Sequence, residues 1–103
     1  MFDTDEAKEV ETKKKDMRPQ AEITLDFPVT VDATEYKTLT MRRPKTKDSV
    51  KAAKMRNVTE VERGILLLAD LCGVAPNVIG ELDEIDAIKL NEQLEAFRGG
   101  QSS

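Results

Sequence analysis

Three acidic side chains close together, Asp83, Glu84 and Asp86, are the residues whose type and spacing best suit chemistry in this sequence. Carboxylate oxygens bind hard divalent cations, but a calcium-binding loop also needs a glycine at its sharp turn, and no such loop surrounds these residues. The same residues suit the first turn of a helix, where Asp83 can cap the backbone and the other two face the positive end of the helix dipole. We therefore expect a structural role and no metal site.

Cys72 is the single cysteine, and the sequence contains no histidine. One cysteine cannot form an intrachain disulfide or a cysteine-based zinc site, and without histidine the commonest general base and transition-metal ligand are absent. Cys72 lies in an apolar helical pattern, so we expect a core cysteine and not an activated thiolate. A glycine-rich phosphate loop is also missing. The sequence predicts a non-enzymatic protein with no catalytic, cofactor-binding or metal-binding residues.

DNA binding is suggested by the stretch Leu68–Leu82. It matches the helix-turn-helix spacing at three positions: Ala69, Gly73 and Ile79. The recognition helix would span residues 76–82, where only Asn77 suits base recognition, and Glu81 with the acids that follow would repel phosphates. We interpret the pattern as helix packing and expect no nucleic-acid partner, while a small DNA-binding regulator remains the first alternative.

Charge is distributed unevenly along this chain of 103 residues, whose net charge is −4. Residues 37–63 contain nine basic and three acidic side chains, whereas residues 21–36 and 64–103 are acidic. This arrangement favours internal charge complementarity, with recognition of an acidic partner as the alternative. The length fits one domain, and a domain of this size is marginally stable alone, so partner binding is expected to contribute to its stability.

Membrane insertion and secretion are not indicated by the sequence. No stretch approaches the roughly 20 apolar residues that cross a bilayer. The N-terminus lacks the basic and apolar regions of a secretion signal. We therefore expect a cytoplasmic protein with no membrane partner.

The first half of the chain predicts a charged tail followed by a β-hairpin. Residues 1–20 have no apolar period, and we expect them to be disordered. Apolar and polar residues then alternate over 21–27, with Pro28 marking an edge or a strand end, and again over 36–41. A turn within 30–34 joins these runs as an antiparallel hairpin.

The second half predicts helices with clear start and stop signals. Thr46 resembles the N-cap of a first helix, which would put Val50 near the core. A second helix runs from the Thr59 capping box to Cys72, with Gly73 as its left-handed stop. Its apolar stripe begins at Val61, and a helix so apolar is either buried centrally or exposes a patch that a partner covers. A short helix begins at Pro76, and a last helix spans 84–98 behind Asp83. The predicted fold class is α+β: an N-terminal antiparallel hairpin packed on a bundle of three main helices, as one domain over 21–98, with a flexible end over 99–103.

The order of these elements resembles the small tail assembly chaperones of Mu-like and P2-like phages, over residues 21–98. The matching segments are the hairpin end Leu39–Pro44, the Leu-rich helix with its Gly73 stop, and the start Leu82–Asp86 of the last helix. Residues 1–20 lie outside the resemblance.

The resemblance implies a role during assembly, encoded by a phage or a prophage. Such chaperones are thought to bind the tape measure protein, a long helical and rather apolar chain, while tail tube subunits polymerise around it. They act in the host cytoplasm and are absent from the mature virion. The tail tube protein, a frameshift-extended form of the chain and a second copy of it are further candidate partners. A structural tail adaptor is the second alternative.

An apolar groove is a known way to accept an amphipathic helix. We predict that the groove is bordered by residues of the Leu-rich helix and of the second strand, together with the two arginines that follow it: Ile65, Leu66, Leu67, Leu71, Leu39, Met41, Arg42 and Arg43. The competing interpretation is that the six apolar residues of this set are ordinary core.

Overall fold

The structure of the chain is a computed structural model that describes residues 16–99. Two strands and four helices follow one another along the chain: β1 (Gln20–Val31), β2 (Thr34–Arg42), α2 (Thr46–Ala53), α3 (Glu60–Cys72), α4 (Pro76–Glu81) and α5 (Glu84–Phe97). This confirms the predicted α+β fold class. Of the predicted tail and flexible end, positions 1–15 and 100–103 lie outside the described residues.

The two strands form an antiparallel hairpin with one apolar face. Ala21 pairs with Met41 and Ile23 with Leu39, and all four side chains are buried. The residues between them in sequence point to the opposite face and are exposed polar side chains. Asp32 and Ala33 form the turn with φ angles of 48° and 67°, the two positive values that a type I′ connection requires. The hairpin therefore offers one face for packing, as its alternation predicts.

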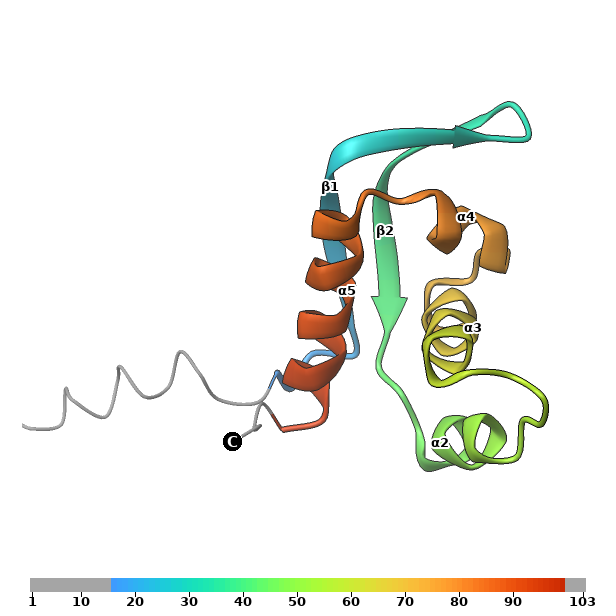
Figure 1. The fold of residues 1–103 in the computed structure, drawn as a ribbon. Coiled ribbons are helices and arrows are strands. Elements are labelled where there is room, and N and C mark those ends of the chain that lie inside the picture. Colours follow the sequence, from blue (N-terminus) through green and yellow to red (C-terminus); the bar gives the residue numbers. More distant parts are fainter. Residues whose placement is uncertain (1–15, 100–103) are drawn as a thin grey trace, which may run out of the picture.

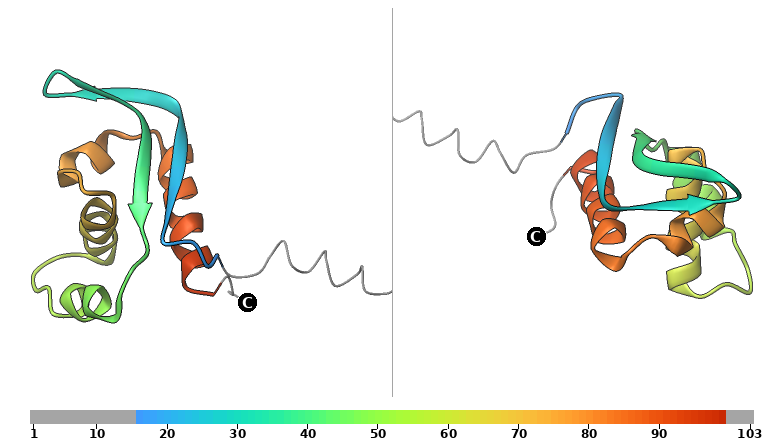
Figure 2. Two further views of the ribbon diagram at one scale, coloured as in Figure 1. Left: turned by 180° about the vertical axis from the view of Figure 1, so that it is seen from behind. Right: turned by 90° about the horizontal axis from the view of Figure 1, so that it is seen from above.

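β1 bends where its pairing with β2 is interrupted, between Thr24 and Val29. Of the two alternatives predicted for Pro28, a sheet edge or a strand end, the structure shows the edge, since β1 continues to Val31 beyond the bend (Figures 1 and 2). A bulge leaves backbone N–H groups without a partner in the strand ladder, and here a side chain accepts their hydrogen bonds. Asp86 of α5 accepts hydrogen bonds from the N–H groups of Asp26 at 2.7 Å and Phe27 at 3.0 Å.

The helices cover the apolar face of the hairpin. α5 contacts β1, α3 contacts β2, and α2 contacts α3 at the edge of the domain. Figure 1 shows α5 beside β1 and α3 beside β2, with α4 connecting the two helices. One core cluster joins the strands to α3, α4 and α5, and Met41 and Leu90 at its centre have no exposed surface.

α3 begins and ends where its sequence signals predict. The Glu62 N–H donates to the Thr59 hydroxyl at 3.0 Å, and the Thr59 N–H donates to the Glu62 carboxylate at 2.9 Å, which completes the capping box. Gly73 ends the helix with a φ of 65°. Asp83 caps α5 in the expected way, since its carboxylate accepts the Ile85 N–H at 3.0 Å.

α2 is turned differently from the prediction. Its N-cap is Lys45 and not Thr46, and the helix ends at Ala53. Its buried residues are Asp48 and Ala52, whereas Val50, which was expected in the core, is 46% exposed. The physical reason is an ion pair: Asp48 turns inward to meet Arg42, and this fixes which face of α2 points to the domain.

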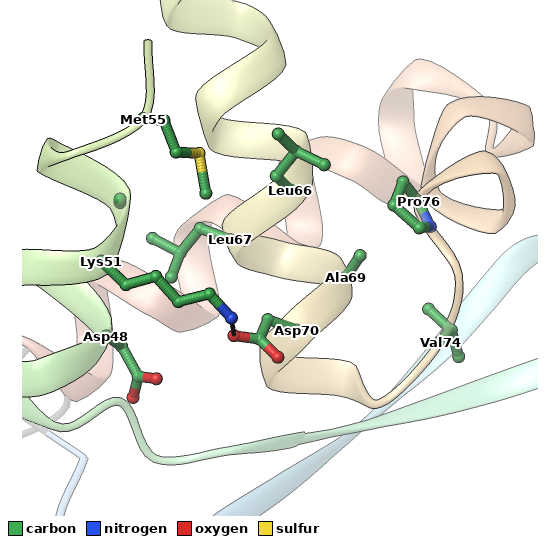
Figure 3. A pocket seen from close by; sticks show the side chains of 10 residues that line it. Asp48, Lys51, Met55, Leu66, Leu67, Ala69, Asp70, Val74 and Pro76 are labelled. Carbon is green, nitrogen blue, oxygen red and sulfur yellow. Dashed lines mark hydrogen bonds and ion pairs between the residues drawn. The ribbon is translucent and has the colours of Figure 1, made fainter. Parts of the chain in front are cut away.

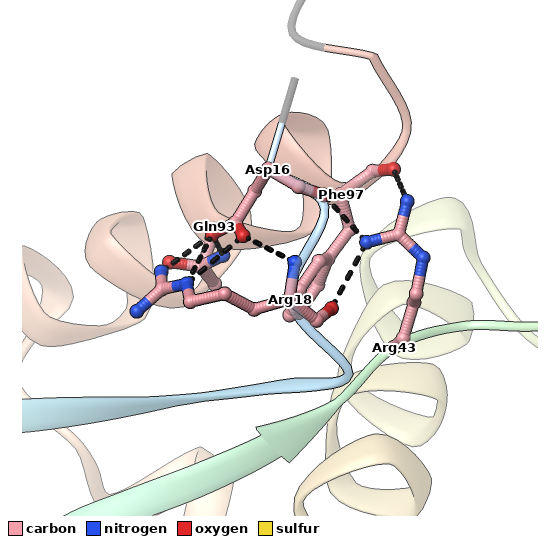
Figure 4. A network of polar contacts seen from close by, with 5 residues as sticks. All are labelled: Asp16, Arg18, Arg43, Gln93 and Phe97. Atoms are coloured by element: carbon pink, nitrogen blue, oxygen red, sulfur yellow. Dashed lines mark hydrogen bonds and ion pairs between the residues drawn. The ribbon is translucent and has the colours of Figure 1, made fainter. Parts of the chain in front are cut away.

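Residues 16–20, predicted as part of the tail, pack on the domain. The Asp16 N–H donates to the carbonyl of Ala96 at 2.8 Å, and the Asp16 carboxylate accepts from the Gln93 side chain at 2.8 Å (Figure 4). The hydrogen bond with Arg18 contributes most to a pKa for Asp16 well below its usual range. The folded part of the chain therefore begins before the predicted boundary at residue 21.

Candidate functional site

Four of the predicted partner-binding residues are core residues of the isolated chain. Leu39, Met41, Leu67 and Leu71 are between 0% and 8% exposed and belong to the cluster that joins the hairpin to α3. They agree with the competing interpretation, because a side chain with so little free surface cannot offer an apolar contact to a partner without a change in the fold.

The two predicted arginines hold the fold together at the end of β2. Arg42 places both terminal nitrogens on the Asp48 carboxylate, at 2.9 and 3.0 Å. This hydrogen bond contributes most to a pKa for Asp48 well below its usual range, helped by the Lys45 N–H and opposed by burial. Arg43 donates to the carbonyls of Phe97 and Arg18, each at 3.1 Å, and its guanidinium lies 5.2 Å from the Phe97 ring centroid (Figure 4).

Ile65 and Leu66 are partly exposed and line hollows on different sides of α3. Leu66 borders a hollow of about 230 Å³ between α2 and α3, together with Met55 and Val74 (Figure 3). The ion pair of Lys51 with Asp70, at 3.3 Å, spans this hollow. It is therefore small and bridged by a polar contact.

Ile65 borders a longer groove that runs between α3 and α5. The groove consists of two adjoining hollows, one of about 420 Å³ at its α4 end and one of about 580 Å³ at its α2 end. The two share Glu60, Gly64 and Asn91 as lining residues. We call it the α3–α5 groove and define its α4 end by six residues: Val61, Gly64, Ile65, Leu68, Leu82 and Ala87.

Val61 makes this groove different from ordinary packing. Val61 lies on the apolar stripe of α3, but its side chain is 72% exposed and stands at the groove wall. α5, which would have to cover Val61, is held against β1 by Asp86. An apolar wall is therefore left open to solvent.

Two glycines lie within helices that line the groove, Gly64 in α3 and Gly80 in α4. Glycine inside a helix is about 1 kcal/mol less favourable than alanine. A Cβ built on either residue meets no heavy atom within 4 Å, so close packing inside the chain does not require glycine there. Gly64, a glycine inside a helix with no turn to require it, is thus the sequence signal that points to the groove.

Acidic side chains border the α4 end of the groove. Glu60 and Glu84 line it, and among the residues described no lysine or arginine does. At the α2 end the lining includes Arg63 and Arg98. Arg63 is occupied, because its guanidinium donates to the carbonyls of Ala52 at 2.9 Å and Met55 at 3.3 Å. The exposed apolar wall thus coincides with the negative part of the groove.

In the part of the chain that the structure describes, the acidic residues at the start of α5 and the single cysteine form no reactive site. Asp83 caps α5, Asp86 is fully buried against the β1 bulge, and Glu84 lies at the groove, so the three carboxylates do not converge on one point. Within residues 16–99 no three acidic or cysteine side chains are arranged to hold a metal ion. Burial raises the pKa of Cys72 to about 11, which keeps its thiol protonated at neutral pH.

The helix-turn-helix spacing corresponds to a real helix crossing. Ala69 and Ile79 are buried where α3 meets α4, and Gly73 supplies the turn between them. α4 has only six residues, none of them basic. Over the described part of the chain, no helix is long and apolar enough to cross a membrane.

Comparison with known proteins gives one finding. A family model described as phage tail assembly chaperone proteins, E, or 41 or 14, matches residues 22–99. This range extends from the third residue of β1 to the residue after the C-cap of α5. No curated protein and no solved structure matches the chain significantly.

Proposed function

The chain belongs to the phage tail assembly chaperone family, and we propose that its partner is the tape measure protein, which it keeps soluble until tail tube subunits enclose it. The chaperone acts without catalysis, in the cytoplasm of a host that carries the phage or prophage, and is absent from the finished particle. The tail tube protein is a further partner of the same assembly step.

The observation that supports this proposal is the open apolar wall of the α3–α5 groove. Val61 is 72% exposed and Ile65 is partly exposed, and both line this groove. A small protein with an open apolar groove is stabilised when a partner covers that groove. Amphipathic helices bind such grooves through apolar residues spaced along one face. A long, rather apolar, helical chain is a partner of this kind.

Co-expression with the tape measure protein from the same gene neighbourhood tests the proposal. We expect the chaperone to copurify with its partner and to move a large part of it from the insoluble to the soluble fraction. The matched control is the tape measure protein expressed alone at the same level. The proposal fails if neither this chain nor a C-terminally extended form binds or solubilises the tape measure protein.

Two further measurements separate this function from the alternatives. Mass spectrometry of purified particles should detect no copies of the chain, and stoichiometric copies would support a structural tail adaptor instead. Titration of labelled duplex DNA should show no binding at low salt. Salt-sensitive duplex binding would support a DNA-binding regulator.

A further inference from the structure

We infer that the α4 end of the α3–α5 groove receives an amphipathic helix whose narrow apolar ridge is flanked by lysine and arginine side chains. The inference rests on the proposed function, since it assigns this helix to the tape measure protein. It names a surface and a chemistry for the partner segment, neither of which follows from the family.

The first argument is the shape of the groove. Gly64 lies on one wall and Gly80 at the end, and at neither position would a Cβ meet a neighbour within 4 Å. Ala87 on the opposite wall also has a small side chain. Small residues let the backbone of a docked helix approach closely, so the groove fits a helix better than a bulky loop.

The second argument is apolar surface without a cover. Val61 and Ile65 stand one turn apart on α3, and Leu68 continues the same face into the core. A partner residue placed between Val61 and Ile65 would contact both side chains. Such a contact needs an apolar ridge on one face of the partner helix, with its residues three and four positions apart.

The third argument is charge. Glu60 and Glu84 border this end of the groove from its two walls, on α3 and α5. Glu84 forms no ion pair among the residues described, and Glu60 forms one exposed pair with Arg63. Complementary charges steer association and select partners, so the helix that fits carries basic residues beside its apolar ridge.

Matched substitutions test the groove with the full chain and the co-expressed tape measure protein. Val61→Lys puts a cation on the apolar wall, and Val50→Lys makes the same change at an exposed valine of α2 outside the groove. We expect Val61→Lys to weaken binding by roughly tenfold or more. Val50→Lys should leave it within about twofold of wild type.

Gly64→Leu fills the groove without disturbing the core. Because glycine is unfavourable in a helix and the space at Gly64 is open, we expect this variant to unfold at the same temperature as wild type or a few degrees higher. Binding should nevertheless fall by roughly tenfold or more. Gly64→Ala serves as the smaller step, with a raised Tm and a smaller loss of binding.

The charge requirement is tested by Glu84→Gln against Glu92→Gln, an exposed position of α5 that does not line the groove. Removing the Glu84 charge should weaken tape measure binding and reduce its sensitivity to salt. Glu92→Gln should change neither. Equal effects of the two substitutions would overturn the charge argument.

The results distinguish failure of the groove from failure of the function. If the tape measure protein binds wild type, Val61→Lys and Gly64→Leu equally well, the groove inference is wrong and the proposed function stands. If groove variants abolish self-association of the chain in analytical ultracentrifugation, the occupant is a second copy and the inference is wrong.

If the tape measure protein does not bind at all, a pair of synthetic helical peptides tests the groove. One contains only leucine, alanine and lysine, and its twin has glutamate in place of lysine. The proposed function then fails, but the groove and its charge preference stand if the lysine peptide alone shifts the NMR amide signals of Val61, Gly64 and Ala87. The groove inference is overturned if neither peptide shifts them or both do so equally.

Discussion

Asp48 and Asp86 occupy the same position in two helices, the third residue of the first turn, in regions that hold them differently. Asp48, at the edge of the domain, is paired with Arg42, whose side chain is 41% exposed. Asp86 has no exposed surface and accepts two backbone N–H groups of the β1 bulge. The Asp48 contact joins two side chains next to solvent. The Asp86 contact joins a side chain to the backbone of a strand, away from solvent.

The difference concerns what remains when the carboxylate is lost. Water can reach Arg42, so the guanidinium keeps solvent partners without Asp48. The N–H groups of Asp26 and Phe27 point to a carboxylate that solvent does not reach, so they would be left without partners. Leaving a buried donor unpaired is more unfavourable than losing an exposed contact. We therefore expect the packing of α5 on β1 to contribute more to stability than the attachment of α2.

Glu62 completes the comparison, because it is the third residue of α3 and is exposed. It accepts the Thr59 N–H within its own helix end and contacts no other element through that carboxylate in the described structure. The three acids thus form a series. Asp86 is buried and binds another element, Asp48 binds a partly exposed arginine, and Glu62 is exposed and, within the described chain, binds only its own helix end.

Asp86→Ala should have the largest effect of the series. It removes the acceptor of two backbone N–H groups and an ion-pair partner of Lys89, whose ammonium nitrogen lies 3.6 Å from the Asp86 carboxylate. We expect a loss of about 3–5 kcal/mol in the free energy of unfolding, measured by urea denaturation. Asp86→Asn, which keeps one oxygen acceptor, should lose less. A loss below about 1 kcal/mol for Asp86→Ala would contradict the comparison.

Asp48→Ala should have a smaller effect, about 2 kcal/mol, because its partner Arg42 regains water. The structural response should also be local. Hydrogen exchange should quicken in α2 (Thr46–Ala53) and remain slow in the core strands, since α2 contacts α3 alone among the main packing pairs. Equal quickening in β1 would show that the two regions are not separable.

Acid should weaken both contacts. Burial acts to raise the pKa of Asp86, but the N–H groups of Asp26 and Phe27 and the Lys89 charge outweigh it, so the pKa lies below its usual value. The pKa of Asp48 is lowered as well, chiefly by Arg42. The unfolded chain therefore binds more protons than the folded chain below about pH 4, and stability must fall as the pH is lowered through that range.

Urea denaturation at several pH values between 7 and 2.5 measures this dependence. Wild type should keep its stability above about pH 5 and lose it progressively below. Asp86→Asn should show a shallower loss, because its side chain does not titrate. An unchanged slope in this variant would mean that Asp86 does not contribute to the acid sensitivity.

Glu62→Ala should have the smallest effect, about 0.5 kcal/mol, since the exposed Thr59 N–H can bind water instead. Thermal unfolding followed by circular dichroism is sensitive enough to rank it against the two aspartates. A loss for Glu62→Ala as large as that for Asp86→Ala would mean that burial does not govern the series.

The sequence predicted the features that depend on neighbours along the chain. The Thr59 capping box, the Gly73 stop and the alternation around Ile23 and Leu39 each rest on residues a few positions apart, and all are present. The class of fold followed from their order.

Features that depend on distant residues were missed. The bulge of β1 has its backbone N–H groups satisfied by Asp86, about 60 positions away. The orientation of α2 requires the Arg42 pair, and the exposure of Ile85 and Ile88, at 46% and 53%, follows from how α5 meets β1. Hydrophobic periodicity predicts that a face is apolar, but not whether another element covers it.

The same limit explains the candidate site. The predicted groove joined the Leu-rich helix to the second strand, whereas the α3–α5 groove lies between two helices. Ile65 lines this groove, and Leu67 lines its α2 end by the little surface it retains. For Val61, the most exposed apolar residue of the groove, the helical pattern allowed burial or exposure, and only the position of α5 decides that it is open. The partner-binding role of these residues stays a prediction.

Arg43 has a consequence for the topology of the domain. It binds the carbonyls of Asp16, Arg18 and Phe97, and so joins the entry of the folded chain to its exit at a single corner. A domain whose two ends lie close together can be inserted into a loop of another protein without stretching the chain. It can also be circularly permuted, with a short linker between the old ends and new ends at the exposed Asp32–Ala33 turn. The fold is, in this sense, already nearly circular.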